Sequence, residues 1–161
     1  MTLLAPQLEH FCDIEATVSP IMDAGPMIGL GRTGQRRIIP ITGGRLLGPH
    51  IQGRVLPGGA DFQWMASDTT IDLDARYLIA LDGDYAGEHI FVKNSAMRRA
   101  PAEVVAKMSR GEAVDPALVY FRCVPTFEVS TPRLQWMTES FFVGSAMRAP
   151  DFVQLSFYRV L

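Results

Sequence analysis

Apolar and polar residues alternate with a period of two along much of the chain, most clearly in residues 69–81. In this segment, TTIDLDARYLIAL, every second position is apolar, whereas the positions between them include Asp72, Asp74 and Arg76. Successive side chains of a β-strand point to opposite faces of the sheet. The pattern therefore predicts a strand with one apolar and one polar face.

Similar alternation, often bounded by Gly or Pro, predicts further strands along the rest of the chain. The segments concerned are 7–18, 36–42, 49–56, 60–66, 88–95, 118–129, 139–146 and 151–160. A chain with this many predicted strands belongs to the all-β class.

Residues 100–114, APAEVVAKMSRGEAV, are the exception and predict a single short α-helix. Pro101 stands near the helix start, Val104 and Met108 are four residues apart, and Gly111 marks the stop. Antiparallel strands in this number pack as a sandwich or close into a barrel. Glycines inside strands, such as Gly53, permit bending and close backbone approach, which favours the barrel. We predict one antiparallel β-barrel domain over residues 1–161.

Composition and charge exclude several classes of function. The net charge of −2 gives no electrostatic reason to expect a nucleic-acid partner. We see neither a signal sequence nor an apolar run long enough to span a membrane, so we expect a cytoplasmic protein.

Motifs for metals and cofactors are also missing from the sequence. Three His without an HExxH motif predict no metal site. Residues 29–34, GLGRTG, lack the strand, helix and GK[ST] ending of a phosphate loop and predict a flexible loop, so we expect no cofactor. Cys12 and Cys123 are far apart in sequence and are expected to be buried free thiols.

Five segments occur in a recognisable order: RRIIPITGG, LPGGADFQ, DLDARY, YFRCVPTFE and LQWM. Together they resemble the domain-of-unknown-function 3237 family, over about residues 8–160. The resemblance implies a compact barrel related in outline to lipocalin-like and calycin-like barrels, often assembled into homo-oligomers. It implies no particular reaction.

The polar face of residues 69–81 is the first candidate site. Arg76 can pair with Asp74 or hold a ligand carboxylate through its planar guanidinium group. We expect Asp74 and Arg76 to point into the lumen and bind a ligand, because DARY belongs to the segments that carry the resemblance. The alternative is a solvated outer face.

The second candidate site lies around the glycine-rich segment HIQGRVLPGGADFQW. A turn at residues 57–59 would join two strands as a hairpin and bring Arg54 close to Asp61. Asp61 would then serve as a catalytic acid or base and Arg54 as a ligand-binding residue. An exposed cross-strand ion pair without a functional role is the alternative.

Residues 118–136 supply the remaining candidates. Glu128 stands beside apolar residues, which would raise the pKa of a carboxyl group and suit it to acid or base catalysis, unless it is paired with an Arg. Tyr120 and Arg122 alternate along the same strand and are expected to bind the ligand. Trp136 is expected to form part of the core or of the pocket wall.

Three functions remain open from the sequence. The first is a cofactor-independent isomerase, cyclase or lyase that transfers protons on a small carbonyl or aromatic metabolite. The second is a carrier or sensor that binds a small molecule without reaction. The third is a structural homo-oligomeric barrel without a ligand.

Overall fold

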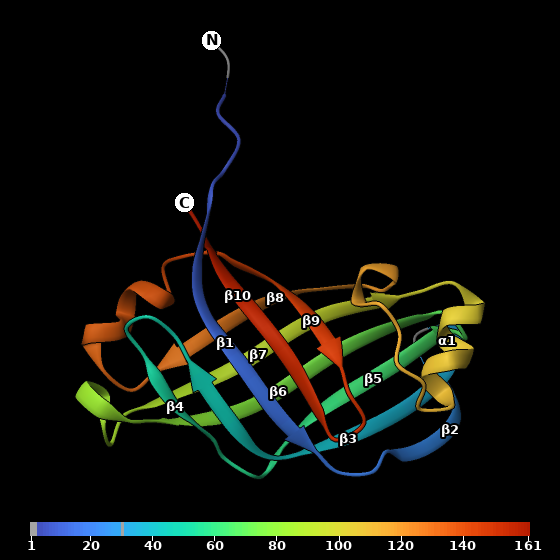
Figure 1. The fold of residues 1–161 in the computed structure, drawn as a ribbon. Coiled ribbons are helices and arrows are strands. Elements are labelled where there is room, and N and C mark those ends of the chain that lie inside the picture. The colour runs from blue at the N-terminus through green and yellow to red at the C-terminus, as the bar shows by residue number, and fades with distance from the viewer. Residues whose placement is uncertain (1–2, 30) are drawn as a thin grey trace.

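Antiparallel strands make up most of the protein (Figure 1). The computed structural model describes residues 3–29 and 31–161. Its strands are β1 (Leu8–Val18), β2 (Met22–Gly29), β3 (Arg32–Leu47), β4 (Gln52–Val55), β5 (Gly59–Ser67), β6 (Thr70–Leu81), β7 (His89–Arg99), β8 (Tyr120–Val129), β9 (Phe142–Arg148) and β10 (Phe152–Val160). The helix α1 (Ala102–Ser109) and the 3-10 helices η1 (Gly83–Tyr85), η2 (Pro116–Leu118) and η3 (Pro132–Met137) lie between strands.

The strands close into an eight-stranded barrel because two strand positions are each filled by two consecutive strands. β1 and β2 both pair with β3, so β2 continues the line of β1. β4 and β5 both lie between β3 and β6. The remaining strands follow in chain order until β10 pairs with β1, which also pairs with β3. The predicted all-β barrel with one short α-helix is confirmed.

The glycine-rich segment between β4 and β5 is not the hairpin turn that the sequence predicted. β4 and β5 run in the same direction and do not pair with each other, since each is antiparallel to β3. The N–H of Leu56 still donates to the carbonyl of Leu78 at 2.8 Å, so Pro57 and Gly58 bulge out of one interrupted strand. The predicted proximity of Arg54 and Asp61, which depended on that turn, is therefore also wrong.

The sequence missed β2 and underestimated β3. β3 begins at Arg32 instead of residue 36, and it forms a hairpin with β2. Residues 29–34, which were expected to form a flexible loop, therefore belong largely to the ends of these two strands, while position 30 lies outside the described residues. Gly25 and Pro26 obscure the alternation in β2, and its register shifts between Asp23 and Gly25.

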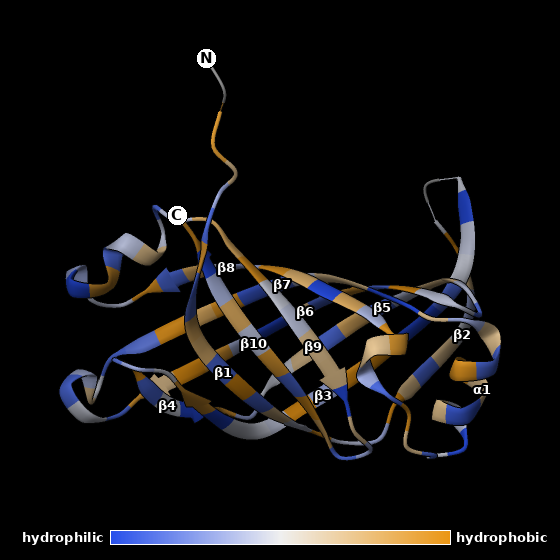
Figure 2. Cartoon of the chain, turned by 45° about the horizontal axis from the view of Figure 1, so that its top comes forward, coloured by the Kyte–Doolittle hydropathy of each residue, from blue (hydrophilic) through white to orange (hydrophobic). Residues whose placement is uncertain are grey.

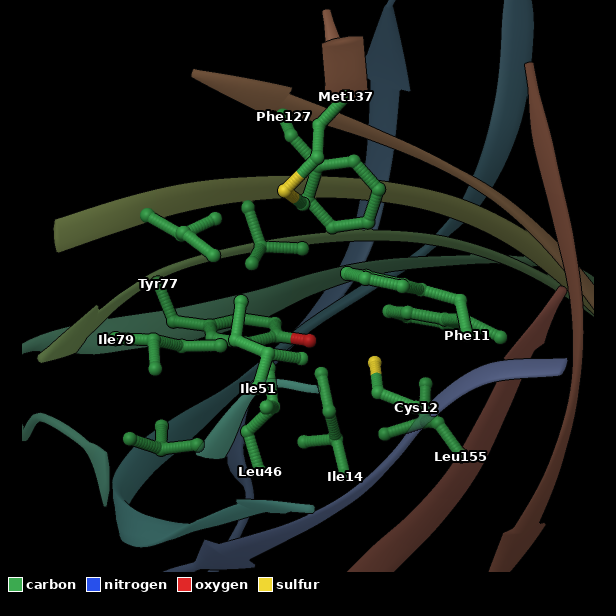
Figure 3. Close-up of a cluster of buried hydrophobic side chains, with 14 of the residues drawn as sticks. Phe11, Cys12, Ile14, Leu46, Ile51, Tyr77, Ile79, Phe127, Met137 and Leu155 are labelled. Carbon is green, nitrogen blue, oxygen red and sulfur yellow. The ribbon is translucent and has the colours of Figure 1, made fainter. Parts of the chain in front are cut away.

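Side chains fill the interior of the barrel near η3. Phe11, Phe127 and Phe142 pack edge-on or tilted, with ring centroids 4.9–5.9 Å apart. Met137 of η3 packs into the same cluster, beside Phe127 in Figure 3, and Trp136 packs against it. Together they fill this end of the barrel. Apolar and polar stretches alternate along the strands (Figure 2), which is expected when one face of each strand is internal.

The other end of the barrel lies near α1 (Figure 1). β7 ends there at Arg99, and β8 begins there at Tyr120. No helix in the described part of the chain is long and apolar enough to cross a membrane.

Candidate functional site in the barrel lumen

A cavity occupies the half of the lumen towards α1. Its walls are mainly apolar and include Val18, Ile39, Leu73, Phe121 and Val153. Its polar lining residues are Asp61, Gln63, Tyr77, Asn94, Arg98 and Arg148. The space open to the centres of water molecules is about 40 Å³. A single water needs roughly 10–15 Å³ by this measure, so the cavity has room for about three waters.

Asp61 of β5 projects into this cavity beside Gln63. The Gln63 Nε2 donates a hydrogen bond of 2.7 Å to Asp61 Oδ2, which fixes the orientation of the carboxyl group. Asp61 Oδ1 is buried. Burial raises the pKa of Asp61, while the Gln63 hydrogen bond and the charges of Arg98 and Arg148 oppose this rise. One carboxyl oxygen is therefore held in place and the other faces the lumen.

Two arginines enter the same cavity from different strands, Arg98 from β7 and Arg148 from β9. Burial lowers the pKa of Arg98, and the nearby positive charge of Arg148 lowers it further. Burial likewise lowers the pKa of Arg148. The charge of Asp61 opposes both of these decreases, so the two guanidinium groups and this carboxyl group form one charged cluster in which the arginines can bind an anion.

Tyr77 and Asn94 supply the polar groups deeper in the lumen. Tyr77 is 2% exposed and Asn94 is 3% exposed. Figure 3 shows the Tyr77 hydroxyl directed into the interior, on the side of Cys12. Burial raises the pKa of Tyr77 far above its ordinary value, so its hydroxyl remains protonated and able to donate.

Four buried side-chain polar atoms in residues 3–29 and 31–161 have no hydrogen-bonding partner there, and all four belong to residues that line this cavity. They are Asp61 Oδ1, Tyr77 OH, Asn94 Oδ1 and Arg148 Nη1. A buried polar group without a partner costs about 1–3 kcal/mol, so each such group calls for an explanation. Their concentration in one apolar-walled cavity distinguishes the lumen from the rest of the interior.

Comparison with known proteins assigns the chain to a family. The family model described as "Protein of unknown function (DUF3237)" matches residues 6–160. The chain belongs to this family. A UPF0311 protein of Rhodopseudomonas palustris is 42% identical over 160 residues, which cover 98% of this chain and 100% of the relative.

Solved structures of similar proteins share the architecture. A conserved protein of unknown function from Rhodopseudomonas palustris superposes with a TM-score of 0.88 at 38% identity, over 99% of this chain and 100% of the other. A beta-barrel like protein from Acinetobacter baumannii gives a TM-score of 0.82 at 33% identity, over 99% of both chains. An enzyme from Penicillium herquei gives 0.69 at 20% identity, over 100% of this chain and 98% of the other, and shares the fold.

Asp61 is the one predicted site residue that lines the lumen cavity. Asp74 and Arg76 lie on the outside of β6, where Arg76 Nη2 contacts Asp74 Oδ2 at 2.9 Å. Their predicted lumen orientation is wrong, because the apolar face of β6, including Tyr77 and Ile79, fills the barrel instead. The pairing of Arg76 with Asp74 is confirmed, and their solvated environment matches the alternative.

Arg54 is exposed on the outside of β4. Its Nε lies 3.6 Å from Asp82 Oδ1. Asp61, which points inward from β5, is opposite Ile39 and Ala75. The structure therefore separates the two members of the predicted site.

The remaining candidates also lie away from the lumen cavity. Tyr120, Arg122 and Glu128 occupy the exposed positions of β8, whose other face is buried. The Arg122 guanidinium lies over the Tyr120 ring at 5.4 Å, beside a surface hollow. Trp136 packs in the cluster near η3, as expected for a core residue, with the Arg159 guanidinium 4.9 Å from its ring centroid.

Sequence reasoning missed Arg98, Arg148, Tyr77 and Asn94 as lining residues. The signal for Arg98 was present, because it follows Ile90, Val92, Asn94 and Ala96 at intervals of two. Ending the predicted strand at residue 95 left it out. Arg148 likewise continues the inward positions of β9 beyond the predicted end at residue 146.

The cysteines and the described acidic and histidine side chains offer no metal centre. Within residues 3–29 and 31–161, no three His, Cys, Asp or Glu side chains are grouped so that they could hold a metal ion. Cys12 and Cys123 are buried and free, as predicted. Burial raises the pKa of Cys123 to about 11, which keeps this thiol in its poorly nucleophilic protonated form at neutral pH.

Proposed function

We propose that the protein binds a small organic anion in the lumen and uses Asp61 to move a proton on it. The reaction class is that of a cofactor-independent isomerase, cyclase or lyase acting on a carbonyl-bearing metabolite. The observation that carries the proposal is the group of four unpartnered buried polar atoms that face one apolar-walled cavity. Pockets for small molecules combine apolar walls with a few placed polar groups in this way.

Each polar group has a role that follows from its geometry. Arg98 and Arg148 would hold the anionic group of the ligand. The Asp61 Oδ1 atom would remove a proton from the carbon next to the carbonyl, which leaves an enolate and a protonated Asp61. Return of that proton to another carbon or to an oxygen completes the transfer without any net oxidation or reduction.

Gln63 acts as a positioning residue for this step. Its hydrogen bond to Asp61 Oδ2 leaves Oδ1 as the oxygen that faces the substrate. The raised pKa of Asp61 strengthens the carboxylate as a base relative to an ordinary solvent-exposed Asp. The positive charges of Arg98 and Arg148 would stabilise the negative charge of the enolate.

An isotope-exchange experiment tests the proposal. The protein is incubated in D₂O with phenylpyruvate and with 2-oxobutanoate, and loss of the proton next to the carbonyl is followed by NMR. We expect exchange above the buffer rate and a decrease of about 100-fold or more in Asp61→Asn, the range for loss of a general base. Asp74→Asn is the matched control, since Asp74 lies outside the barrel.

Binding is measured in parallel by calorimetry with wild type, Arg98→Gln and Arg99→Gln. Arg98 lines the cavity and Arg99 lies at the surface hollow, so only Arg98→Gln should weaken binding. Exchange that is equally fast in wild type and Asp61→Asn would contradict the catalytic role. Ligand binding that depends on Arg98 without any exchange would instead indicate a carrier.

A further inference from the structure

The cavity has unpartnered polar groups towards both of its ends, and the wall between them is mainly apolar apart from the Asp61–Gln63 pair. Asp61 is opposite Ala75, and Ala75 is opposite Asn94, so these residues mark one level of the barrel. Tyr77 lies two residues farther along β6, towards the end closed by η3. Arg98 lies four residues along β7 from Asn94 in the opposite direction, near α1.

The separation of these levels is large enough for two groups of one molecule. A strand advances about 3.3 Å per residue, so the backbone positions of Tyr77 and Arg98 differ by roughly 20 Å along the strands. The arginine side chain is long and reaches back towards Asp61, whose pKa its charge affects. Leu73, Ala96 and Phe121 line the wall between the two levels, together with Gln63, whose amide nitrogen is bonded to Asp61.

The deep level has the hydrogen-bonding character of a site for a hydroxyl group. The Tyr77 hydroxyl can donate or accept, and Asn94 Oδ1 can only accept; neither atom has a partner in the described part of the protein. A ligand hydroxyl has both the hydrogen that Asn94 Oδ1 accepts and the lone pairs to which the Tyr77 hydroxyl donates. A carboxylate has no hydrogen to donate to Asn94, and a hydrocarbon satisfies neither group.

We propose that the ligand of the lumen is a hydroxy-carboxylate, which places its hydroxyl group against Tyr77 and Asn94 and its carboxylate against Arg98 and Arg148. This inference rests on the proposed lumen site and adds the chemical class of its ligand. The body between the two groups is mainly apolar, to match Leu73, Ala96 and Phe121, and passes Asp61. The molecule therefore enters with its hydroxyl end first.

A series of matched acids tests the inference. Benzoate, phenylacetate and 3-phenylpropanoate are each compared with their para-hydroxy derivatives by calorimetry, because the series varies the distance between the two groups. We expect at least one hydroxylated acid to bind about tenfold more tightly than its plain counterpart, the gain typical of one or two well-made hydrogen bonds. The methyl ester of that acid should lose most of its affinity.

Two substitutions assign the preference to the deep level. In Tyr77→Phe and in Asn94→Ala, the hydroxylated and plain acids should bind within about twofold of each other. Binding of the plain acid should be unchanged in Tyr77→Phe. Tyr120→Phe, an exposed tyrosine on β8, should keep the full preference.

Thermal melting provides a readout that does not depend on affinity alone. Without ligand, Tyr77→Phe should melt at the same or a higher temperature than wild type, because it removes a buried hydroxyl without a partner. With the hydroxylated acid, its melting temperature should rise less than that of wild type.

The possible outcomes separate this inference from the proposed function. If plain acids bind in an Arg98-dependent manner and the hydroxyl group gives no advantage at any length, the hydroxy-carboxylate assignment fails and the lumen site stands. Water then fills the deep level. If no acid of the series binds at millimolar concentration, both the assignment and the anion site are overturned.

Discussion

At the scale of single residues, the main result is that two aspartates with similar sequence surroundings have opposite environments. Asp61 faces the apolar lumen, and burial raises its pKa. Asp74 faces solvent beside Arg76, whose hydrogen bond lowers its pKa. Both occupy strands that alternate apolar and polar residues, so the direction in which each strand faces determines their chemistry.

The raised pKa of Asp61 predicts a specific pH dependence of stability. The folded protein holds the Asp61 proton more tightly than the unfolded chain, whose carboxyl pKa is near 3.8. Folding therefore becomes less favourable as the pH rises from that value through the raised pKa of the folded state. Asp61→Asn cannot ionise, so its stability relative to wild type should increase over this pH range and then remain constant.

Urea denaturation at a series of pH values measures this difference. The control, Asp74→Asn, should instead lose stability relative to wild type as the pH rises to neutral, since it removes a carboxylate that Arg76 stabilises. That loss should be small, because the pair is exposed to solvent. A stability difference between Asp61→Asn and wild type that does not vary with pH would refute the raised pKa of Asp61 in the folded protein.

At the scale of elements, β4 and β5 form one interrupted strand that pairs with β3 on one side and with β6 on the other. Gly53 and Gly59 stand on either side of this interruption, and both lie against the backbone of β6. A Cβ atom at Gly59 would lie 2.5 Å from the Arg76 carbonyl oxygen and 2.6 Å from Tyr77 Cβ. At Gly53 it would lie 2.5 Å from the Ala80 oxygen. Glycine is needed here because the two strands approach closely.

A pair of alanine substitutions tests this close approach. Gly59→Ala should destabilise the protein by about 2 kcal/mol, the range for steric overpacking. Gly43→Ala is the control in β3, because its Cβ would meet ordinary contacts of 3.6 Å or more. Chemical denaturation gives both values, and equal stabilities of the two variants would contradict the close packing of β5 on β6.

The sequence predicted the alternation of residues well, but several spatial relations depended on contacts distant in sequence. Pro57-Gly58-Gly59 suits a hairpin turn and a bulge equally well, and only the shared pairing with β3 distinguishes them. The predicted inward orientation of Asp74 and Arg76 in β6 was wrong, because alternation alone does not say which face of a strand is internal. Arg98 was predictable in principle, since the alternation in β7 continues to it.

At the scale of the whole molecule, the barrel interior is divided into an aromatic end and a polar end. Phe142 and Phe157 are almost fully buried near η3, whereas Asp61, Arg98 and Arg148 gather towards α1. The buried aromatic side chains near η3 stabilise the fold, whereas the unpartnered polar atoms towards α1 lower the stability of the folded protein. The predicted homo-oligomer stays a prediction.

Two adjacent phenylalanines test the structural role of the packed end. Phe142→Ala should cost about 3–5 kcal/mol, because it removes a fully buried ring from the cluster. Phe141 is 82% exposed, so Phe141→Ala should change stability by less than about 0.5 kcal/mol. Thermal or urea denaturation measures both, and a small effect at Phe142 would contradict a tightly packed end.

Because side chains fill the barrel near η3, a ligand of the proposed lumen site would have to enter from the side of α1. A molecule that enters from the side of α1 must leave by the same route. A reaction that splits its substrate would therefore release its two fragments in a fixed order: the anionic fragment held by the arginines departs first, and the deeper fragment follows. The released anion would compete directly with incoming substrate, whereas the deeper fragment could rebind only when the outer position is free.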